Sequence, residues 1–277
     1  MKTKKIIIGL LIAFVIIIAI AAIYMYPSYR FFFHSDTTQI DKDLTVVFGG
    51  GGNSGILITD SAVLVIDTKM AKNAEKLCEL VKQKAGNKPI IVINTHYHFD
   101  HLGGNKFYKG DKIYIGNYTK EFLQKNVKSE AMPTIFVQDS LILNMGNETV
   151  MLYNMGQAHT YNDMVVYLKN RKLLFSGDLV FYNVNPVLKK ESGADVDKWI
   201  AVLNTILHKW EVNTIIPGHG ESGGKELLIS MKNYFEDMKI AASNPGKQKE
   251  IIKKYKKWMR MPNMASPEIT ISYLKGN

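Results

Sequence analysis

The stretch Thr95-His96-Tyr97-His98-Phe99-Asp100-His101 decides which fold we expect for this chain of 277 residues. It holds three of the seven histidines and one aspartate within six consecutive positions. The apolar, β-branched run 89–94 precedes it and predicts a buried strand, and the glycines of 102–105 predict a turn after it. Neutral imidazole and carboxylate are ligands that Zn²⁺ and related ions take. The sequence therefore predicts a strand that ends in a metal-binding loop.

Further side chains of ligand type follow strand-like runs and stand beside a glycine or a turn: Asp67, His159, Asp178 and His219. The chain repeats one coarse pattern, in which a strand ends in Asp67 or Asp178, a helix follows, and the next strand ends in histidine. This pattern predicts two similar α/β halves that bring these side chains to one shared edge.

The number of candidate ligands at that edge indicates more than one ion. The set is His96, His98, Asp100, His101, His159, Asp178 and His219. A single tetrahedral ion needs three or four ligands, so this set favours two ions that share a carboxylate, about 3.5–4 Å apart. The only cysteine, Cys78, lies on the apolar stripe of a predicted helix over 71–84, which indicates a buried structural thiol.

The order of these residues, HxHxDH at 96–101 and then His159, Asp178 and His219, resembles the metallo-β-lactamase-fold hydrolases over about residues 42–240. The resemblance implies an α/β fold, the αββα metallo-β-lactamase sandwich, with a binuclear site at one edge. It implies a first ion held by His96, His98 and His159, and a second ion held by Asp100, His101 and His219. It implies that Asp178 is a ligand of both ions. It also implies that Asp67 orients a ligand histidine.

The resemblance implies hydrolysis of a small-molecule substrate with two Zn²⁺ ions per chain, with Fe or Mn as the alternative metals. A metal-bridging hydroxide would attack the substrate, and Asp100 would act as the catalytic residue that passes a proton to the leaving group. With an aspartate at position 178 the chain is more similar to the glyoxalase II, lactonase and ribonuclease Z groups, because the zinc β-lactamases usually carry Cys or Ser there. We therefore expect an ester, thioester, lactone or amide as substrate.

Three alternatives stay open. The first is β-lactam hydrolysis. The second is an oxidoreductase like the persulfide dioxygenases, which resemble this family but bind one iron through two histidines and one aspartate. The third is a non-enzymatic metal-binding module, which the full ligand set disfavours because such modules usually lose ligands.

An uncharged apolar run, Ile6–Tyr26, predicts one N-terminal transmembrane helix that ends at Pro27. Twenty-one residues at helical rise span about 30 Å, the thickness of the hydrocarbon layer. The lysines at positions 2, 4 and 5 favour an N-terminus that stays inside, with the catalytic domain on the extracytoplasmic side. The alternative is secretion after cleavage of a signal peptide near Ala19-Ile20-Ala21.

These patterns divide the chain into a signal anchor with linker (1–35), a hydrolase domain (36–245) and a basic C-terminal helix and tail (246–277). The formal net charge is +10, and much of the excess lies near the two ends. We interpret this charge as membrane topology together with a lysine-rich surface, and expect no nucleic acid as partner. The sequence does not indicate an oligomeric state.

Two loops are candidates for the surroundings of the site. The glycine run 49–55 lacks the Lys-Ser/Thr of a phosphate-binding loop, and predicts either a bend or a mobile cover over the site. Tyr182, Asn183 and Asn185 follow the strand of Asp178 and are candidates to line the cleft.

Overall fold

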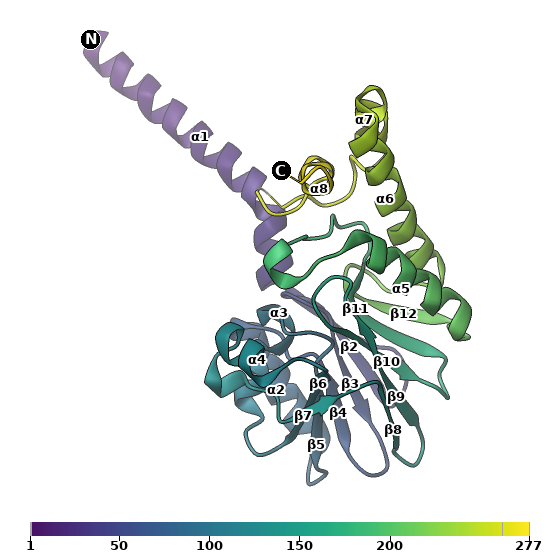
Figure 1. Ribbon diagram of the computed structural model, residues 1–277. Helices are drawn as coiled ribbons and strands as arrows, with labels where there is room; N and C mark the ends of the chain where they lie inside the picture. Colours follow the sequence, from purple (N-terminus) through teal and green to yellow (C-terminus); the bar gives the residue numbers. More distant parts are fainter. Residues whose placement is uncertain (1, 262, 277) are drawn as a thin grey trace.

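The computed structural model describes residues 2–261 and 263–276 and contains two β-sheets packed face to face (Figure 1). The seven-stranded sheet has its strands in chain order, namely β1 (Ser35–Gln39), β2 (Leu44–Gly49), β3 (Ser54–Ile58), β4 (Val63–Ile66), β5 (Ile90–Ile93), β6 (Lys112–Gly116) and β7 (Ile135–Val137). The five-stranded sheet has the order β12 (Thr214–His219), β11 (Leu173–Phe181), β10 (Asp163–Leu168), β9 (Thr149–Gly156) and β8 (Ser140–Asn144).

Helices cover the outer faces of both sheets, so the expected α/β sandwich is confirmed (Figure 1). The helices are α1 (Lys2–Phe33), α2 (Ala71–Ala85), α3 (Phe99–Leu102), α4 (Lys120–Asn126), α5 (Val196–Lys209), α6 (Glu226–Ser243), α7 (Gln248–Lys254) and α8 (Pro267–Leu274). The apolar stripe of α2, including Leu77 and the buried Cys78, packs on one sheet, and α5 and α6 pack on the other.

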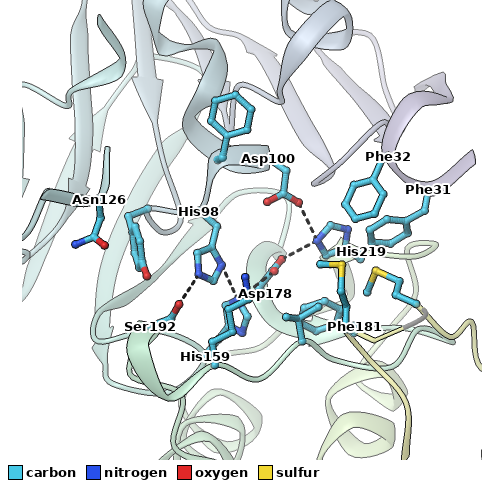
Figure 2. A pocket seen from close by; sticks show the side chains of 16 residues that line it. Phe31, Phe32, His98, Asp100, Asn126, His159, Asp178, Phe181, Ser192 and His219 are labelled. Atoms are coloured by element: carbon cyan, nitrogen blue, oxygen red, sulfur yellow. Dashed lines mark hydrogen bonds and ion pairs between the residues drawn. The ribbon is translucent and has the colours of Figure 1, made fainter. Parts of the chain in front are cut away.

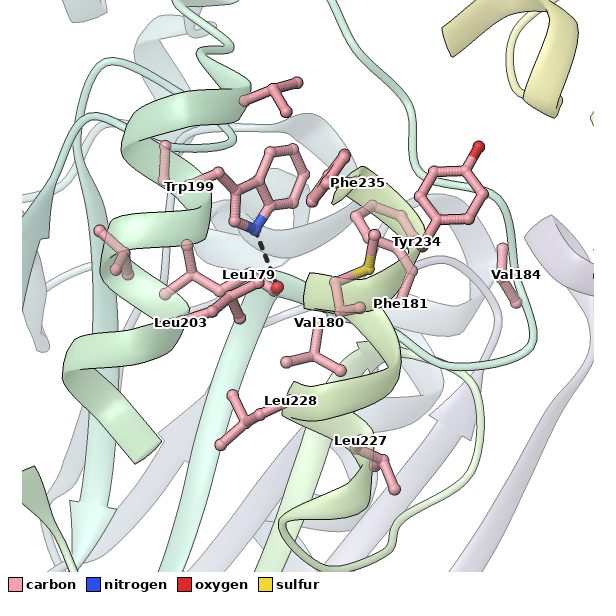
Figure 3. Packing of buried hydrophobic residues seen from close by; sticks show 14 of the residues in the cluster. Leu179, Val180, Phe181, Val184, Trp199, Leu203, Leu227, Leu228, Tyr234 and Phe235 are labelled. Atoms are coloured by element: carbon pink, nitrogen blue, oxygen red, sulfur yellow. Dashed lines mark hydrogen bonds between the residues drawn. The ribbon is translucent and has the colours of Figure 1, made fainter. Parts of the chain in front are cut away.

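Burial of apolar side chains explains this layering. One cluster lies between the sheets and includes Leu64, Ile93 and Phe175. Another lies under α5 and α6, where Leu203 and Phe235 pack beside Trp199, whose indole Nε1–H donates to the carbonyl oxygen of Leu179 at 2.9 Å (Figure 3). The helices α2, α5 and α6 thus each place an apolar stripe against a sheet, as hydrophobic burial requires.

Parallel pairing determines which strand ends meet. β4 pairs with β5, and β11 pairs with β12, in parallel registers. The carboxyl ends of parallel neighbours lie at one edge of the sheet. Apart from His159, the candidate ligands lie toward the carboxyl ends of these strands or in the segments that follow them. The short exposed turn Gln138–Asp139 leads from β7 to β8, and so from the seven-stranded to the five-stranded sheet.

The N-terminal helix departs from the sequence prediction. Its segment Ile6–Tyr26 is exposed and is long and apolar enough to cross a membrane. The expected end at Pro27 is wrong, because α1 continues to Phe33. A proline removes one backbone donor and can kink a helix without ending it. The helix continues past the proline when contacts with the rest of the protein stabilise its last turn. Here the carbonyl oxygen of Phe31 accepts from the backbone N–H of Gly51 at 3.0 Å.

The C-terminal segment packs on the second sheet's helices. Tyr255 and Trp258 belong to the same buried cluster as α6, and the indole of Trp258 stacks on Tyr234 with ring centroids 4.9 Å apart. α8, which the sequence did not indicate, is held by a hydrogen bond of 2.9 Å between the hydroxyls of Tyr234 and Thr270. The basic tail therefore extends the apolar core of this half.

Candidate metal centre

The candidate ligands come from five places in the fold and meet at one edge of the sandwich. Figure 2 shows those that line the cavity, namely His98, Asp100, His159, Asp178 and His219. The segment after β5 carries His96 and His98, and α3 carries Asp100 and His101. His159 lies in the loop between β9 and β10, Asp178 lies within β11, and His219 ends β12.

These side chains form two groups, each with ligand atoms within 4.8 Å of one another. The first group is His96, His98, His159 and Asp178, and the second is Asp100, His101 and His219. Asp178 faces both groups. Its Oδ2 lies 3.3 Å from Nε2 of His159, while its Oδ1 lies 3.0 Å from Nε2 of His101 and 3.4 Å from Nε2 of His219.

Several atoms at the centre are buried close to one another but make no hydrogen bond of good geometry, including Nε2 of His96, Nε2 of His101 and Oδ1 of Asp178. Buried polar atoms are normally satisfied, because an unpaired one loses the hydrogen bonds that water would provide. Imidazole nitrogens and a carboxylate oxygen that converge in this way are a suitable donor set for divalent cations. The residues present therefore fit metal ions.

The first group has the protonation states that metal ligands need. Burial lowers the pKa of His98 to about 4 and the pKa of His159 to about 3. Burial also lowers the pKa of His96 well below its usual value, with the neighbouring His101 as a further cause. All three imidazoles are therefore neutral at physiological pH, and neutral imidazole is the form that binds a metal.

In the second group, protonated histidines balance the negative charge of the buried carboxylates when no metal is bound. Burial alone raises the pKa of Asp178, but His219 and His101 lower it well below its usual range. Conversely, burial lowers the pKa of His219, but Asp178 and Asp100 raise it to about 9. A divalent cation that binds here takes the place of these protons.

Asp67 supports the second group from behind. Its Oδ2 lies 2.8 Å from Nδ1 of His101, and its Oδ1 accepts from the backbone N–H of Thr95 at 2.8 Å. A carboxylate at Nδ1 fixes the tautomer of the ring and leaves Nε2 available as a ligand atom. The hydroxyl of Ser192 lies 3.2 Å from Nε2 of His98 in the same manner, although no sequence pattern pointed to this serine.

A glycine in the left-handed conformation precedes Asp178 and directs its side chain into the site. Gly177 has a φ of +51°, and the pairing of β11 with β12 shifts register on both sides of it. A Cβ at this position would lie 2.5 Å from Cβ of Thr95. Gly177 is thus required both by its backbone conformation and by the close approach of the segment that carries the histidines.

The glycine run 49–55 packs tightly beneath the second group, so the structure supports the bend and not the mobile cover. Gly51 and Gly52 contact Asp100 and His101, and a Cβ at Gly52 would overlap the imidazole of His101.

The glycine run is held in place by Lys69, a buried residue that the sequence did not indicate. Its Nζ donates to the carbonyl oxygens of Val47, Gly49 and Gly52 at 3.0, 2.6 and 2.7 Å.

The centre opens into a cavity of about 350 Å³. Its walls include His98, Asp100 and His219, together with aromatic and methionine side chains from α1 and the C-terminal segment (Figure 2). The proposed cleft residues lie elsewhere. Tyr182 and Asn183 line a different hollow, and Asn185 is buried, where its side-chain amide donates to the carbonyl oxygen of Met259 at 2.9 Å.

Comparison with known proteins agrees with this geometry. Residues 47–219 match the family described as the metallo-beta-lactamase superfamily. The chain is 30% identical over 181 residues to metallo-beta-lactamase type 2 of Bacillus cereus, which covers 64% of this chain and 70% of that protein. It is 31% identical over 185 residues to metallo-beta-lactamase IND-1 of Chryseobacterium indologenes, covering 64% and 77% of the two chains.

Solved structures show the same fold. A metallo-beta-lactamase from Pontibacter korlensis superposes with a TM-score of 0.64 at 23% identity, over 73% of this chain and 99% of that one. The region that matches the family, residues 47–219, contains the strands from β3 to β12 and all seven candidate ligands. The chain therefore belongs to the metallo-β-lactamase superfamily and is a metal-dependent hydrolase.

Proposed function

We propose that this protein is a binuclear zinc hydrolase that cleaves an ester, thioester, lactone or amide. The observation that carries the proposal is the position of Asp178, whose two carboxylate oxygens face two separate groups of ligand atoms. In this assignment the first ion would be held by His96, His98 and His159, and the second by Asp100, His101 and His219. Asp178 would serve as a ligand to both.

Two divalent ions bound there would supply a nucleophilic hydroxide near neutral pH and a Lewis acid for the substrate oxygen. The protein supplies orientation and proton transfer. Asp67 and Ser192 hold ligand imidazoles in position. Asp100 lines the cavity, and its Oδ2 lies 3.4 Å from Nε2 of His219. Burial raises the pKa of Asp100, but His101 and His219 lower it below its usual value. The resulting carboxylate can accept a proton and pass it to the leaving group.

A second candidate substrate class is favoured by the relatives. The curated proteins to which the chain is similar bear the name metallo-beta-lactamase. A β-lactam is a cyclic amide, so the same centre would open it by the same attack on a carbonyl carbon. We keep β-lactam hydrolysis as the alternative, because Asp178 occupies the place where the zinc β-lactamases that the sequence resembles usually carry Cys or Ser.

The decisive experiment joins metal analysis to a substrate panel. The purified chain is assayed against an ester, a thioester, a lactone and a β-lactam, and its bound metal is quantified. We expect two zinc ions per chain and loss of both hydrolysis and metal in Asp178→Ala. One iron per chain would instead support the persulfide dioxygenase alternative. Unchanged turnover in both Asp178→Ala and His98→Ala would refute the site assignment.

We further propose that Ile6–Tyr26 anchors the catalytic domain on the extracytoplasmic side of a membrane, with residues 1–35 as anchor and linker, 36–245 as hydrolase domain and 246–277 as basic tail. This apolar helix meets the requirements of an anchor and also those of a signal sequence. The mass of the mature N-terminus distinguishes the two, since cleavage near Ala21 removes most of the apolar run.

A further inference from the structure

The end of the anchor helix reaches the metal centre itself. The ring of Phe31 stacks on the imidazole of His219, with centroids 4.6 Å apart and planes 26° apart (Figure 2). Phe181 stacks on the same imidazole at 5.1 Å and 22°. Phe31 and Phe32 line the cavity, whereas the neighbouring Phe33 is 54% exposed and lies outside it.

The contacts of this segment with the domain are specific. The backbone N–H of Gly51 donates to the carbonyl oxygen of Phe31, and the side-chain amide of Asn73 donates to that of Phe32 at 3.3 Å. Gly51 belongs to the loop beneath Asp100, so the helix end is attached to the support of the second ligand group. The last turn of α1 is therefore a wall of the catalytic cavity.

The cavity lies close to the end of the membrane-crossing run. Phe31 lies five positions after Tyr26 in the same helix, and five steps at helical rise span about 7.5 Å. Each headgroup layer of a bilayer is about 5–7 Å thick. An anchor that crosses the membrane with Ile6–Tyr26 thus holds the cavity wall at the level of the lipid headgroups.

The C-terminal segment lies on the same side of the molecule (Figure 1). Ile23 and Tyr24 of α1 line one hollow together with Trp258 and Ile269. Exposed lysines accompany this segment, at positions 253, 254, 256 and 257. Lysines at a membrane surface are attracted to anionic headgroups. This surface is therefore suited to lie against a bilayer beside the mouth of the cavity.

The cavity walls are suited to a hydrocarbon chain. Apart from the ligand groups, most of the lining residues are apolar, namely Phe31, Phe32, Phe99, Phe181, Val187, Met261 and Met264. The polar lining residues are Tyr97, Asn126, Lys189 and Ser192. Methionine adapts to flexible apolar ligands, and Met264 is 39% exposed at the surface. Partly exposed apolar side chains of this kind next to a reaction centre mark a binding surface.

We propose that the cavity takes the acyl chain of a membrane amphiphile and that the substrate is a long-chain fatty-acyl ester. This inference rests on the proposed hydrolase function and on a retained anchor. In the reaction, the oxygen of water bonds to the acyl carbon, the bond from that carbon to the alcohol oxygen breaks, and this oxygen takes a proton. The products are a fatty acid and an alcohol.

The test uses the full chain with zinc in nanodiscs of ether-linked phosphatidylcholine, which has no acyl ester to compete, and compares p-nitrophenyl dodecanoate with p-nitrophenyl acetate. We expect the wild type to prefer dodecanoate in kcat/KM. Phe32→Ala should reduce the ratio of the two kcat/KM values about tenfold, because part of the apolar wall is removed. The matched control Phe33→Ala, which changes an exposed ring one position away, should leave the ratio as in the wild type.

A second readout does not depend on turnover. A dodecanoate that carries a photoreactive diazirine should label peptides from residues 28–34 and 259–266, and free dodecanoate should compete. Hydrolysis of acetate or a β-lactam without chain-length preference, or labelling confined to other peptides, overturns the acyl-chain proposal. If zinc-loaded wild-type protein hydrolyses none of these substrates but is labelled at these peptides, the proposed hydrolase function is overturned and the acyl-chain site remains supported.

Discussion

At the scale of single residues, the centre depends on side chains that would touch no substrate. Asp67 is the clearest case, because its carboxylate contacts His101 at Nδ1 and holds the segment of Thr95 through the backbone. Its own backbone has a φ of +56°, an uncommon conformation for a residue other than glycine. Strain of this kind persists where surrounding contacts fix it, as they do beside this site.

We predict that Asp67→Asn weakens binding of the second zinc ion about 10–100-fold, because the tautomer of His101 is no longer fixed by a carboxylate. The first ion should stay bound. Metal content after dialysis against a series of free zinc concentrations measures both affinities. Asp139→Asn, on an exposed turn, is the control and should bind as the wild type does. An equal loss of both ions would contradict the assignment of Asp67 to the second group.

Lys69 gives a second prediction at this scale. Replacement by Met keeps much of the volume but leaves three carbonyl oxygens without their donor. We expect Lys69→Met to lower the free energy of unfolding by about 3 kcal/mol, because buried acceptors without partners are costly. Urea unfolding measures this loss. The exposed neighbour Lys72→Met should change stability by less than about 0.5 kcal/mol. A loss of similar size in both variants would mean that the three carbonyls do not depend on Lys69.

At the scale of elements, the sequence predicts what local patterns determine. The apolar runs before Asp67 and His96 indicated β4 and β5, and the spacing of Leu77 and Cys78 indicated α2. The sequence did not predict β1, α8 or the extension of α1 to Phe33, because these elements depend on contacts with distant segments. The candidate site follows the same division. Ligand types were visible in the chain, whereas Ser192, Lys69 and Phe31 acquire their positions only through the fold.

The helix layer over the five-stranded sheet allows a direct test of packing. Leu203 on α5 is fully buried among α6 and β11 (Figure 3). We expect Leu203→Ala to cost about 3 kcal/mol in the free energy of unfolding, from lost apolar burial and the cavity that remains. Thermal or denaturant unfolding measures the change. Thr205→Ala, on the exposed face of the same helix, serves as the control. Equal stability of the two variants would show that this layer contributes little.

At the scale of the whole molecule, the two ligand groups should respond differently to pH. His98 and His159 have pKa values of about 4 and about 3, so the first group has no imidazole proton to lose near neutrality. His219 has a pKa of about 9 in the metal-free protein, so it must release a proton to bind zinc. Affinity at the second group should rise about tenfold or more per pH unit between about pH 6 and pH 8.

Zinc titration against a chromophoric chelator at several pH values measures both constants in one sample. Affinity at the first group should stay nearly constant over this range, which makes it an internal control. Parallel slopes for the two ions would contradict the assigned protonation states.

The turn Gln138–Asp139 is a suitable place to divide the chain into two separate fragments, because it is exposed and joins the two sheets. Every candidate ligand before it lies within His96–His101, and His159, Asp178 and His219 come after it. Each of the two groups draws on both sides of the turn, so neither fragment alone holds a complete group. Tight binding of a zinc ion would therefore require that the two fragments associate, so that zinc affinity would report their association.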